Sequence, residues 1–111
     1  MLPADARLRN SSDIAVAMRQ GTKYSSRLIV IHVASEMSHS TKVAFAVGKS
    51  VGNSVVRHLI TRRLRHIVAH ELDQFPAGSF VVVRALPASA TASYAQLEEN
   101  VGFALAKVRA A

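Results

Sequence analysis

One segment, predicted to be a helix from Asn53 to about Asp73, has two chemically opposite faces. At helical spacing its apolar residues fall on one side, namely Val56, Ile60, Leu64 and Ile67. The other side is basic and carries Arg57, Thr61 and Arg65, with His58 and Arg62 beside them. No Asp or Glu occurs between Glu36 and Glu71, so no neighbouring acid on this helix can neutralise the cations. We predict that one face packs against a core and the other binds a polyanion.

Composition limits the class of protein. The chain has 111 residues, of which 50% are hydrophobic, so we predict one core and a single domain spanning residues 1–111. Its net charge of +7 suits an anionic partner. The absence of cysteine excludes disulfides, thiolate metal sites and cysteine nucleophiles. We see neither a signal peptide nor a membrane span, and we expect a soluble, cytoplasmic protein with no membrane partner and no obligate protein partner.

The remaining elements follow from periodicity and from capping residues. Ser11 or Ser12 is predicted to cap a first helix that ends near Gly21. Branched residues predict two antiparallel strands, over 27–33 and 41–47, joined by a polar loop. After the basic helix we predict a strand over 80–86, a flexible connection over 87–93 and a closing helix from Tyr94 to about Val108.

Gly48 and Gly52 bracket a tight loop before the basic helix. The sequence Gly48-Lys49-Ser50 is similar to the end of a nucleotide-binding phosphate loop, but that motif requires glycine where Val43 stands. A glycine-bearing loop that leads into a helix still presents backbone amides and the positive end of the helix dipole to an anion. The loop is therefore expected either to bind a backbone phosphate or to be an ordinary turn between a strand and a helix.

The histidines raise two chemical alternatives. His66 and His70 have the spacing of two zinc ligands on one helix face, but no third ligand accompanies them, and we expect no metal site. A nuclease could use His32 and His58 as an acid and a base, with Lys49 stabilising charge. The basic segment has no carboxylates to hold divalent ions. Binding is favoured over chemistry, and we assign no catalytic residue to this chain.

The stretch "VAFAVGKSVGNSVVRHLITRRLR", residues 43–65, resembles the signature of the bacterial ribonuclease P protein subunit. The similarity extends to "RLR" at residues 7–9, to the first helix with its closing glycine at 13–21, and to "FVVVRALP" at 80–87. Several spaced elements agree in order over nearly the whole chain.

The resemblance implies a fold and an activity. The expected fold is α+β, a single-domain α/β sandwich with a mixed central sheet, about three helices and a left-handed βαβ crossover, as in ribosomal protein S5 domain 2. The expected enzyme is an RNA-protein holoenzyme that removes the 5′ leader of precursor tRNA. Its catalytic RNA carries out the chemistry with Mg²⁺, while the protein binds that RNA and the leader. The alternative function is that of an RNA-binding protein of the ribosome without a catalytic role.

The resemblance also implies two groups of contact residues. The residues expected to bind the RNA subunit are Lys49, Ser50, Asn53, Arg57, His58, Arg62, Arg63 and Arg65. The residues expected to bind the leader are Arg7, Arg9, Ile14, Met18 and His32. The family usually has Asn, Arg and Lys where this chain has His58, Leu59 and Thr61, and we expect Arg63 to replace part of the missing charge. Aromatic rings of the family's leader cleft are replaced by Ile14 and Met18, whereas His32 keeps a planar group.

Overall fold

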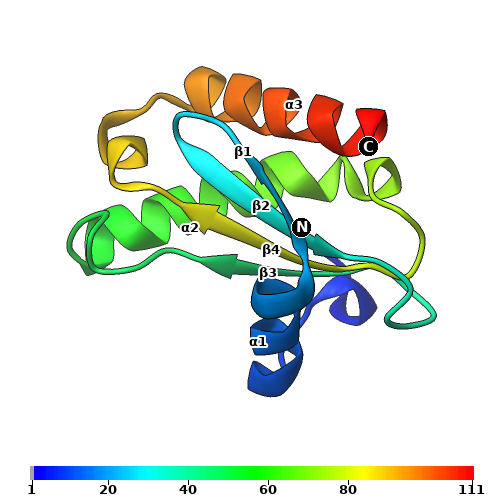
Figure 1. Ribbon diagram of the computed structural model, residues 1–111. Coiled ribbons are helices and arrows are strands. Elements are labelled where there is room, and N and C mark those ends of the chain that lie inside the picture. Colours follow the sequence, from blue (N-terminus) through cyan, green and yellow to red (C-terminus); the bar gives the residue numbers. More distant parts are fainter. Residues whose placement is uncertain (1) are drawn as a thin grey trace.

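A computed structural model of the protein describes residues 2–111. Its four strands are β1 (Thr22–Ser25), β2 (Ile29–Ala34), β3 (Lys42–Ala46) and β4 (Phe80–Ala85). They form one sheet in the order β1-β2-β4-β3 (Figure 1). β2 pairs antiparallel with β1 and with β4, whereas β3 pairs parallel with β4. The sheet is mixed, as predicted.

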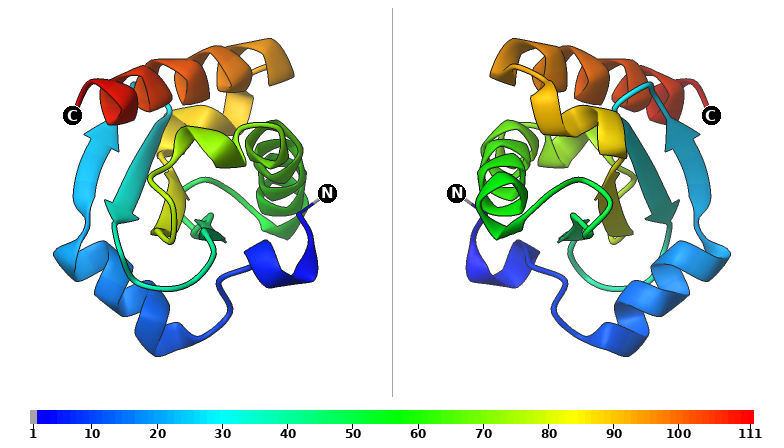
Figure 2. Two further views of the ribbon diagram at one scale, coloured as in Figure 1. Left: turned by 90° about the vertical axis from the view of Figure 1, so that its right-hand side faces the viewer. Right: turned by 90° about the vertical axis from the view of Figure 1, so that its left-hand side faces the viewer.

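Three helices cover the sheet: α1 (Ser11–Gln20), α2 (Ser54–Ala69) and α3 (Tyr94–Ala110). Short 3-10 turns precede α1 and follow α2 and β4, namely η1 (Ala4–Ala6), η2 (Leu72–Gln74) and η3 (Pro87–Thr91). Figure 2 shows α2 and α3 on one face of the sheet and α1 on the other. The expected α+β sandwich with about three helices is confirmed.

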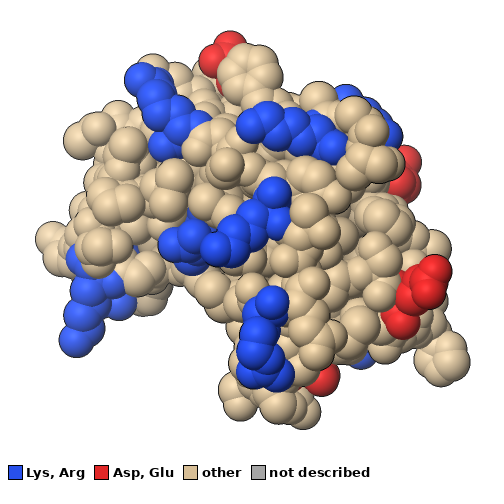
Figure 3. Space-filling model, viewed as in Figure 1, with Lys and Arg blue, Asp and Glu red and all other residues tan. Residues whose placement is uncertain are grey.

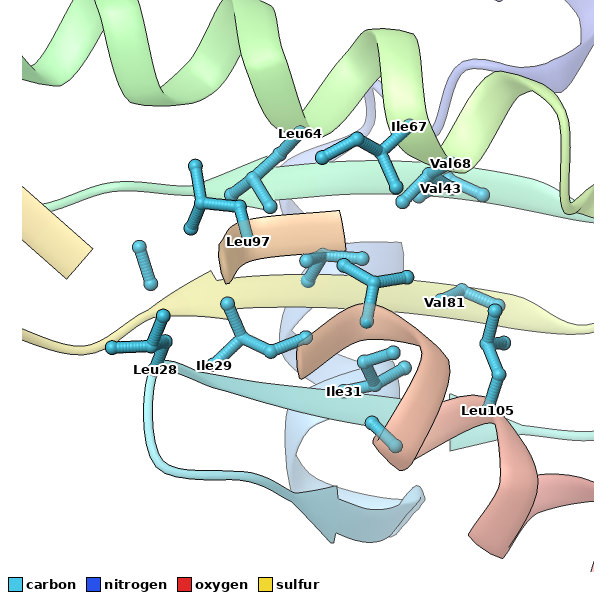
Figure 4. Packing of buried hydrophobic residues seen from close by; sticks show 14 of the residues in the cluster. Leu28, Ile29, Ile31, Val43, Leu64, Ile67, Val68, Val81, Leu97 and Leu105 are labelled. Atoms are coloured by element: carbon cyan, nitrogen blue, oxygen red, sulfur yellow. The ribbon is translucent and has the colours of Figure 1, made fainter. Parts of the chain in front are cut away.

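The main core lies between the sheet and the pair α2 and α3. The central strands contribute Ile29, Ile31, Val81 and Val83, each 0% exposed. Side chains from both helices pack onto these positions, as Figure 4 shows for Leu64, Leu97 and Leu105. The alternate positions of β2 and β4 point to the α1 side and are also largely buried. Because both faces are covered, both strands are apolar apart from His32 in β2 and Arg84 in β4.

The structure corrects the arrangement of the first strands. The two predicted strands do run in opposite directions, but β4 lies between β2 and β3, so they are not neighbours. The chain instead passes from β3 through α2 to the parallel strand β4, the crossover whose left-handed sense the resemblance predicts. β1 was not predicted, because its four residues are mostly exposed and carry too short a pattern.

The ends of the helices also differ from prediction. The side chain of Asn10, and neither Ser11 nor Ser12, caps α1 by accepting a hydrogen bond from Ser12 N–H at 2.9 Å. α2 ends at Ala69, short of Asp73, because the chain turns through η2 and buries Phe75 against the core.

The connection over residues 87–93, predicted to be flexible, contains the 3-10 turn η3 (Pro87–Thr91) and is fixed by hydrogen bonds. Ser89 is 0% exposed, and its hydroxyl donates to the carbonyl oxygen of Leu86 at 2.7 Å. Ser93 then forms a capping box with Gln96 at the start of α3. These hydrogen bonds satisfy backbone groups that a mobile loop would leave to water.

Candidate nucleic-acid interface

The outward face of α2 is defined by the way the helix packs. Asn53 caps the first turn, since its side-chain oxygen accepts a hydrogen bond from Val56 N–H at 3.0 Å. Ile60, Leu64 and Val68 are 0% exposed and lie in the main core. Their spacing of four residues fixes the rotation of the helix about its axis. The basic side predicted from the sequence therefore faces solvent.

The cations of this face differ in their exposure. Arg62, Arg65 and His58 are exposed, whereas Arg57 is half-buried. The Nε atom of Arg57 is shielded from solvent and has no hydrogen-bond partner among residues 2–111. Thr61 turns its hydroxyl back to the helix and donates to the carbonyl oxygen of Arg57 at 2.8 Å. Arg62 and Arg65 thus point fully outward, while Arg57 lies at the border of the face.

The three departures from the family pattern lie together. A shallow hollow of about 670 Å³ on the outward face is lined by Val55, His58, Leu59, Thr61, Arg62 and Arg65. Val55 is 75% exposed, so this part of α2 presents apolar surface in the same hollow as the guanidinium groups of Arg62 and Arg65. The face can bind phosphate at its arginines and contact a ribose or a base through its apolar residues.

Arg63 lies on a different side of α2, toward α3. Its Nη1 donates a hydrogen bond to the carbonyl oxygen of Ala92 at 3.2 Å. The structure therefore separates Arg63 from the outward face on which we expected it to replace missing charge.

The loop between β3 and α2 forms one end of the outward face. Lys49 and Ser50 are exposed at the tip of a turn in which Val51 N–H donates to the carbonyl oxygen of Gly48 at 3.1 Å. Val51 is 5% exposed and anchors the turn to the core. The positive end of the α2 dipole follows directly, and both features attract an anion.

Within the described residues, the hydrogen bonds that guanidinium groups donate all go to uncharged oxygen atoms, and none goes to a carboxylate. Among residues 2–111 they go to the carbonyl oxygens of Leu2 and Ala92 and to the side-chain oxygen of Gln74. The outward face of α2 therefore keeps its positive charge, which favours association with a polyanion.

Three of the predicted leader-binding residues, Ile14, Met18 and His32, lie on the α1 side of the sheet. Ile14 and Met18 are half-buried and pack against a small cluster formed by Leu8, Ala17, Ala34, Phe80 and Val82. They therefore contribute to the packing of α1 as well as lining its surface. Ile14 also borders a groove of about 320 Å³ that contains Arg7, Arg9 and Arg65.

His32 lies in the middle of β2 and is only 2% exposed. Neither of its ring nitrogens has a hydrogen-bond partner among residues 2–111. Burial lowers the pKa of His32 below its usual 6.5, and the charges of Arg84 and Lys23 lower this pKa further. The imidazole is therefore neutral near pH 7, and at 2% exposure it offers a leader nucleotide almost no surface to contact.

Two cations beside His32 were not predicted from the sequence. Lys23 pairs with His32 across β1 and β2, and Arg84 is two positions beyond Val82, the partner of His32 on β4. Side chains at these positions point to the same face of the sheet. Figure 3 shows Lys and Arg gathered over the strands between α3 and α1, with acidic residues toward the margin. Strand register was needed to find them, because the sequence alone gives no pairing.

Comparison with known proteins shows the family. A family model described as Ribonuclease P matches residues 2–109. The ribonuclease P protein component of Streptomyces bikiniensis is 41% identical, and the match covers 97% of this chain and 95% of that protein. The corresponding protein of Acidothermus cellulolyticus is 46% identical over 87% of this chain and 82% of its own length. The chain belongs to the ribonuclease P protein family.

Solved structures of ribonuclease P proteins share the fold. The protein of Staphylococcus aureus superposes with a TM-score of 0.80 at 22% identity, covering 93% of this chain and 96% of that one. The protein of Thermotoga maritima gives a TM-score of 0.75 at 18% identity, covering 95% and 96%. As a member of this family, the chain is the protein subunit of ribonuclease P, a tRNA-processing ribozyme holoenzyme.

The geometry argues against the histidine-dependent nuclease. His32 is buried on the α1 side of the sheet, whereas His58 lies on the outward face of α2, beyond the opposite side. An acid and a base must both lie within hydrogen-bond reach of one scissile phosphate, which these two residues cannot do.

A metal site on the protein would need several donor side chains close together. Over residues 2–111, no three His, Asp or Glu side chains come close enough together to hold a metal ion. The described residues thus offer no cluster of three ligands for the Mg²⁺ expected for the family. Within the same residues, no helix combines the length and apolar character that a membrane span requires.

Proposed function

We propose that this ribonuclease P protein binds the catalytic RNA through the outward face of α2 and the Lys49 loop. The observation that carries the proposal is a helix with one face buried in the core and the other cationic, in a segment without carboxylates. Phosphate contacts of this kind position an RNA without reading its sequence. Affinity should therefore depend strongly on salt.

The α1 side is the proposed binding surface for the 5′ leader of precursor tRNA. The groove that contains Arg7, Arg9 and Arg65 supports this assignment, since it extends from the RNA-binding side of the protein to Ile14 on α1. A single strand leaving the catalytic RNA at Arg65 would follow a cationic path toward α1. Arg84 and Lys23 supply further charge on the same face of the sheet.

In this proposal the protein positions RNA and leaves hydrolysis to the catalytic RNA. Leader removal needs Mg²⁺, which the RNA subunit would hold, because the described part of the protein offers no cluster of metal ligands. Cations on the protein lower the repulsion between the catalytic RNA and the precursor, and this reduces the Mg²⁺ concentration needed for cleavage. The proposed site of action is the cytoplasm.

A reconstitution assay tests the proposal. Precursor tRNA is incubated at low Mg²⁺ with the catalytic RNA alone, with the protein alone, and with both. We expect leader removal in the combined reaction only. Cleavage by the protein alone would identify a protein nuclease, and no difference between the RNA with and without protein would contradict the proposed role.

A further inference from the structure

A second recessed surface lies where α2 meets the start of α3. Arg62, Arg63, His66 and Tyr94 line a hollow of about 350 Å³ there. The ring nitrogen Nδ1 of His66 and the hydroxyl of Tyr94 are hydrogen-bonded at 2.6 Å, and the two ring centroids are 5.9 Å apart. The hydrogen bond joins the two helices across the hollow and holds both rings in fixed positions.

Neighbouring residues also hold the side chains that line this hollow. Arg63 donates a hydrogen bond to the carbonyl oxygen of Ala92, and His70 packs edge-on against His66 with ring centroids 5.1 Å apart. Tyr94 is half-buried against the main core and follows the Ser93 cap of α3. A site whose side chains are already ordered loses little conformational entropy when a ligand binds.

We infer that this hollow, which we call the α2–α3 slot, holds one unpaired nucleotide of the catalytic RNA. The base lies against Tyr94 and His66, and the phosphates on either side of the nucleotide lie near Arg62 and Arg63. Aromatic rings and guanidinium planes are the groups on which proteins stack unpaired RNA bases. The volume lies within the range of sites that hold a small molecule. The inference rests on the proposed binding of the catalytic RNA.

The position of the slot selects the RNA subunit over the leader as the source of the nucleotide. Arg62 lines both this slot and the hollow on the outward face of α2, so the two surfaces are continuous. The proposed leader surface lies across the sheet, on the α1 side. RNA bound along α2 would reach the slot without leaving the protein, whereas a leader would have to pass around the sheet.

Two variants of Tyr94 test the slot. Tyr94→Ala removes the ring and should weaken binding of the catalytic RNA by roughly 5-fold to 150-fold, the range found when a base-stacking ring is truncated. Tyr94→Phe keeps the ring and loses only the hydrogen bond to His66, so it should bind more tightly than Tyr94→Ala, because stacking needs only the aromatic face. Phe103→Ala is the control, since Phe103 is 57% exposed on α3 and lies outside the slot. It should bind like the wild-type protein.

The outcomes separate this inference from the proposed function. If the wild-type protein fails to bind the catalytic RNA, the proposed function is wrong. If the wild type binds and Tyr94→Ala binds equally well, only the slot is wrong. If Tyr94→Ala binds the catalytic RNA normally but the holoenzyme loses affinity for precursor tRNA, the nucleotide comes from the substrate and our assignment of its source is overturned.

Crosslinking decides the case in which Tyr94→Ala does not fold. A photoreactive phenylalanine analogue is placed at position 94, or at position 103 as the control, and each protein is irradiated in complex with the catalytic RNA. We expect a crosslink to an unpaired nucleotide from position 94 and none from position 103. No crosslink from position 94, or one to a base-paired segment, would refute the slot.

Discussion

Removing the two fully outward arginines of α2 should reduce the salt dependence of RNA binding by a calculable amount. In Arg62→Ala/Arg65→Ala, two phosphate contacts are lost while Arg57, which is half-buried, is left in place. Each contact contributes about 0.7 for a single strand to about 0.9 for a duplex to the slope of log K against log salt. The slope should therefore fall by about 1.4 to 1.8. Over a fourfold range of salt concentration, this difference corresponds to about 7-fold to 12-fold in affinity.

The assay is a titration of the catalytic RNA at several concentrations of monovalent salt. Arg27→Ala/Arg109→Ala is the matched control, because it removes two exposed arginines that lie outside the outward face of α2. Both double variants lower the net charge by the same two units. Equal slopes for the two variants would show that overall charge, and not the face of α2, determines binding. Unchanged folding by circular dichroism is expected, since exposed substitutions usually alter stability by no more than about 0.5 kcal/mol.

Three further predictions concern the α1 side and the core. Arg84→Ala should weaken holoenzyme binding of precursor tRNA roughly tenfold but leave mature tRNA binding unchanged; equal effects on both would exclude a leader contact. His32 has a lowered pKa when folded. As the pH falls below 6.5, the unfolded chain therefore binds more protons, and unfolding free energy should drop by at most about 1.4 kcal/mol per pH unit. In His32→Leu, denaturant titrations should show a smaller decrease in unfolding free energy as the pH falls. An unchanged pH dependence in this variant would contradict the prediction. Asn100→Ala should cost about 1–3 kcal/mol, because the buried Asn100 side chain accepts a hydrogen bond from Leu28 N–H at 3.1 Å. Glu99→Ala, exposed on the same helix, is its control, and equal losses in a thermal melt would rule out that reason.

The candidate site was predictable where it depends on a local period. The spacing of Ile60 and Leu64 correctly placed Arg62 and Arg65 on the solvent side, because one helix face determines the other. The same period could not show that Arg63 points to Ala92, since that contact joins residues 29 positions apart. Nor could it show that His66 and Tyr94 meet across two helices.

The sequence by itself determined the types of the main elements, the cationic face of α2 and, through the motif from Val43 to Arg65, the family. These features arise from the order of neighbouring residues, which sets helical and strand periods directly. Only the tertiary structure decided that β4 separates β2 from β3 and that Lys23 and Arg84 lie beside a buried His32. Strand pairing and helix docking depend on which distant apolar surfaces bury each other, and a local pattern does not specify that choice.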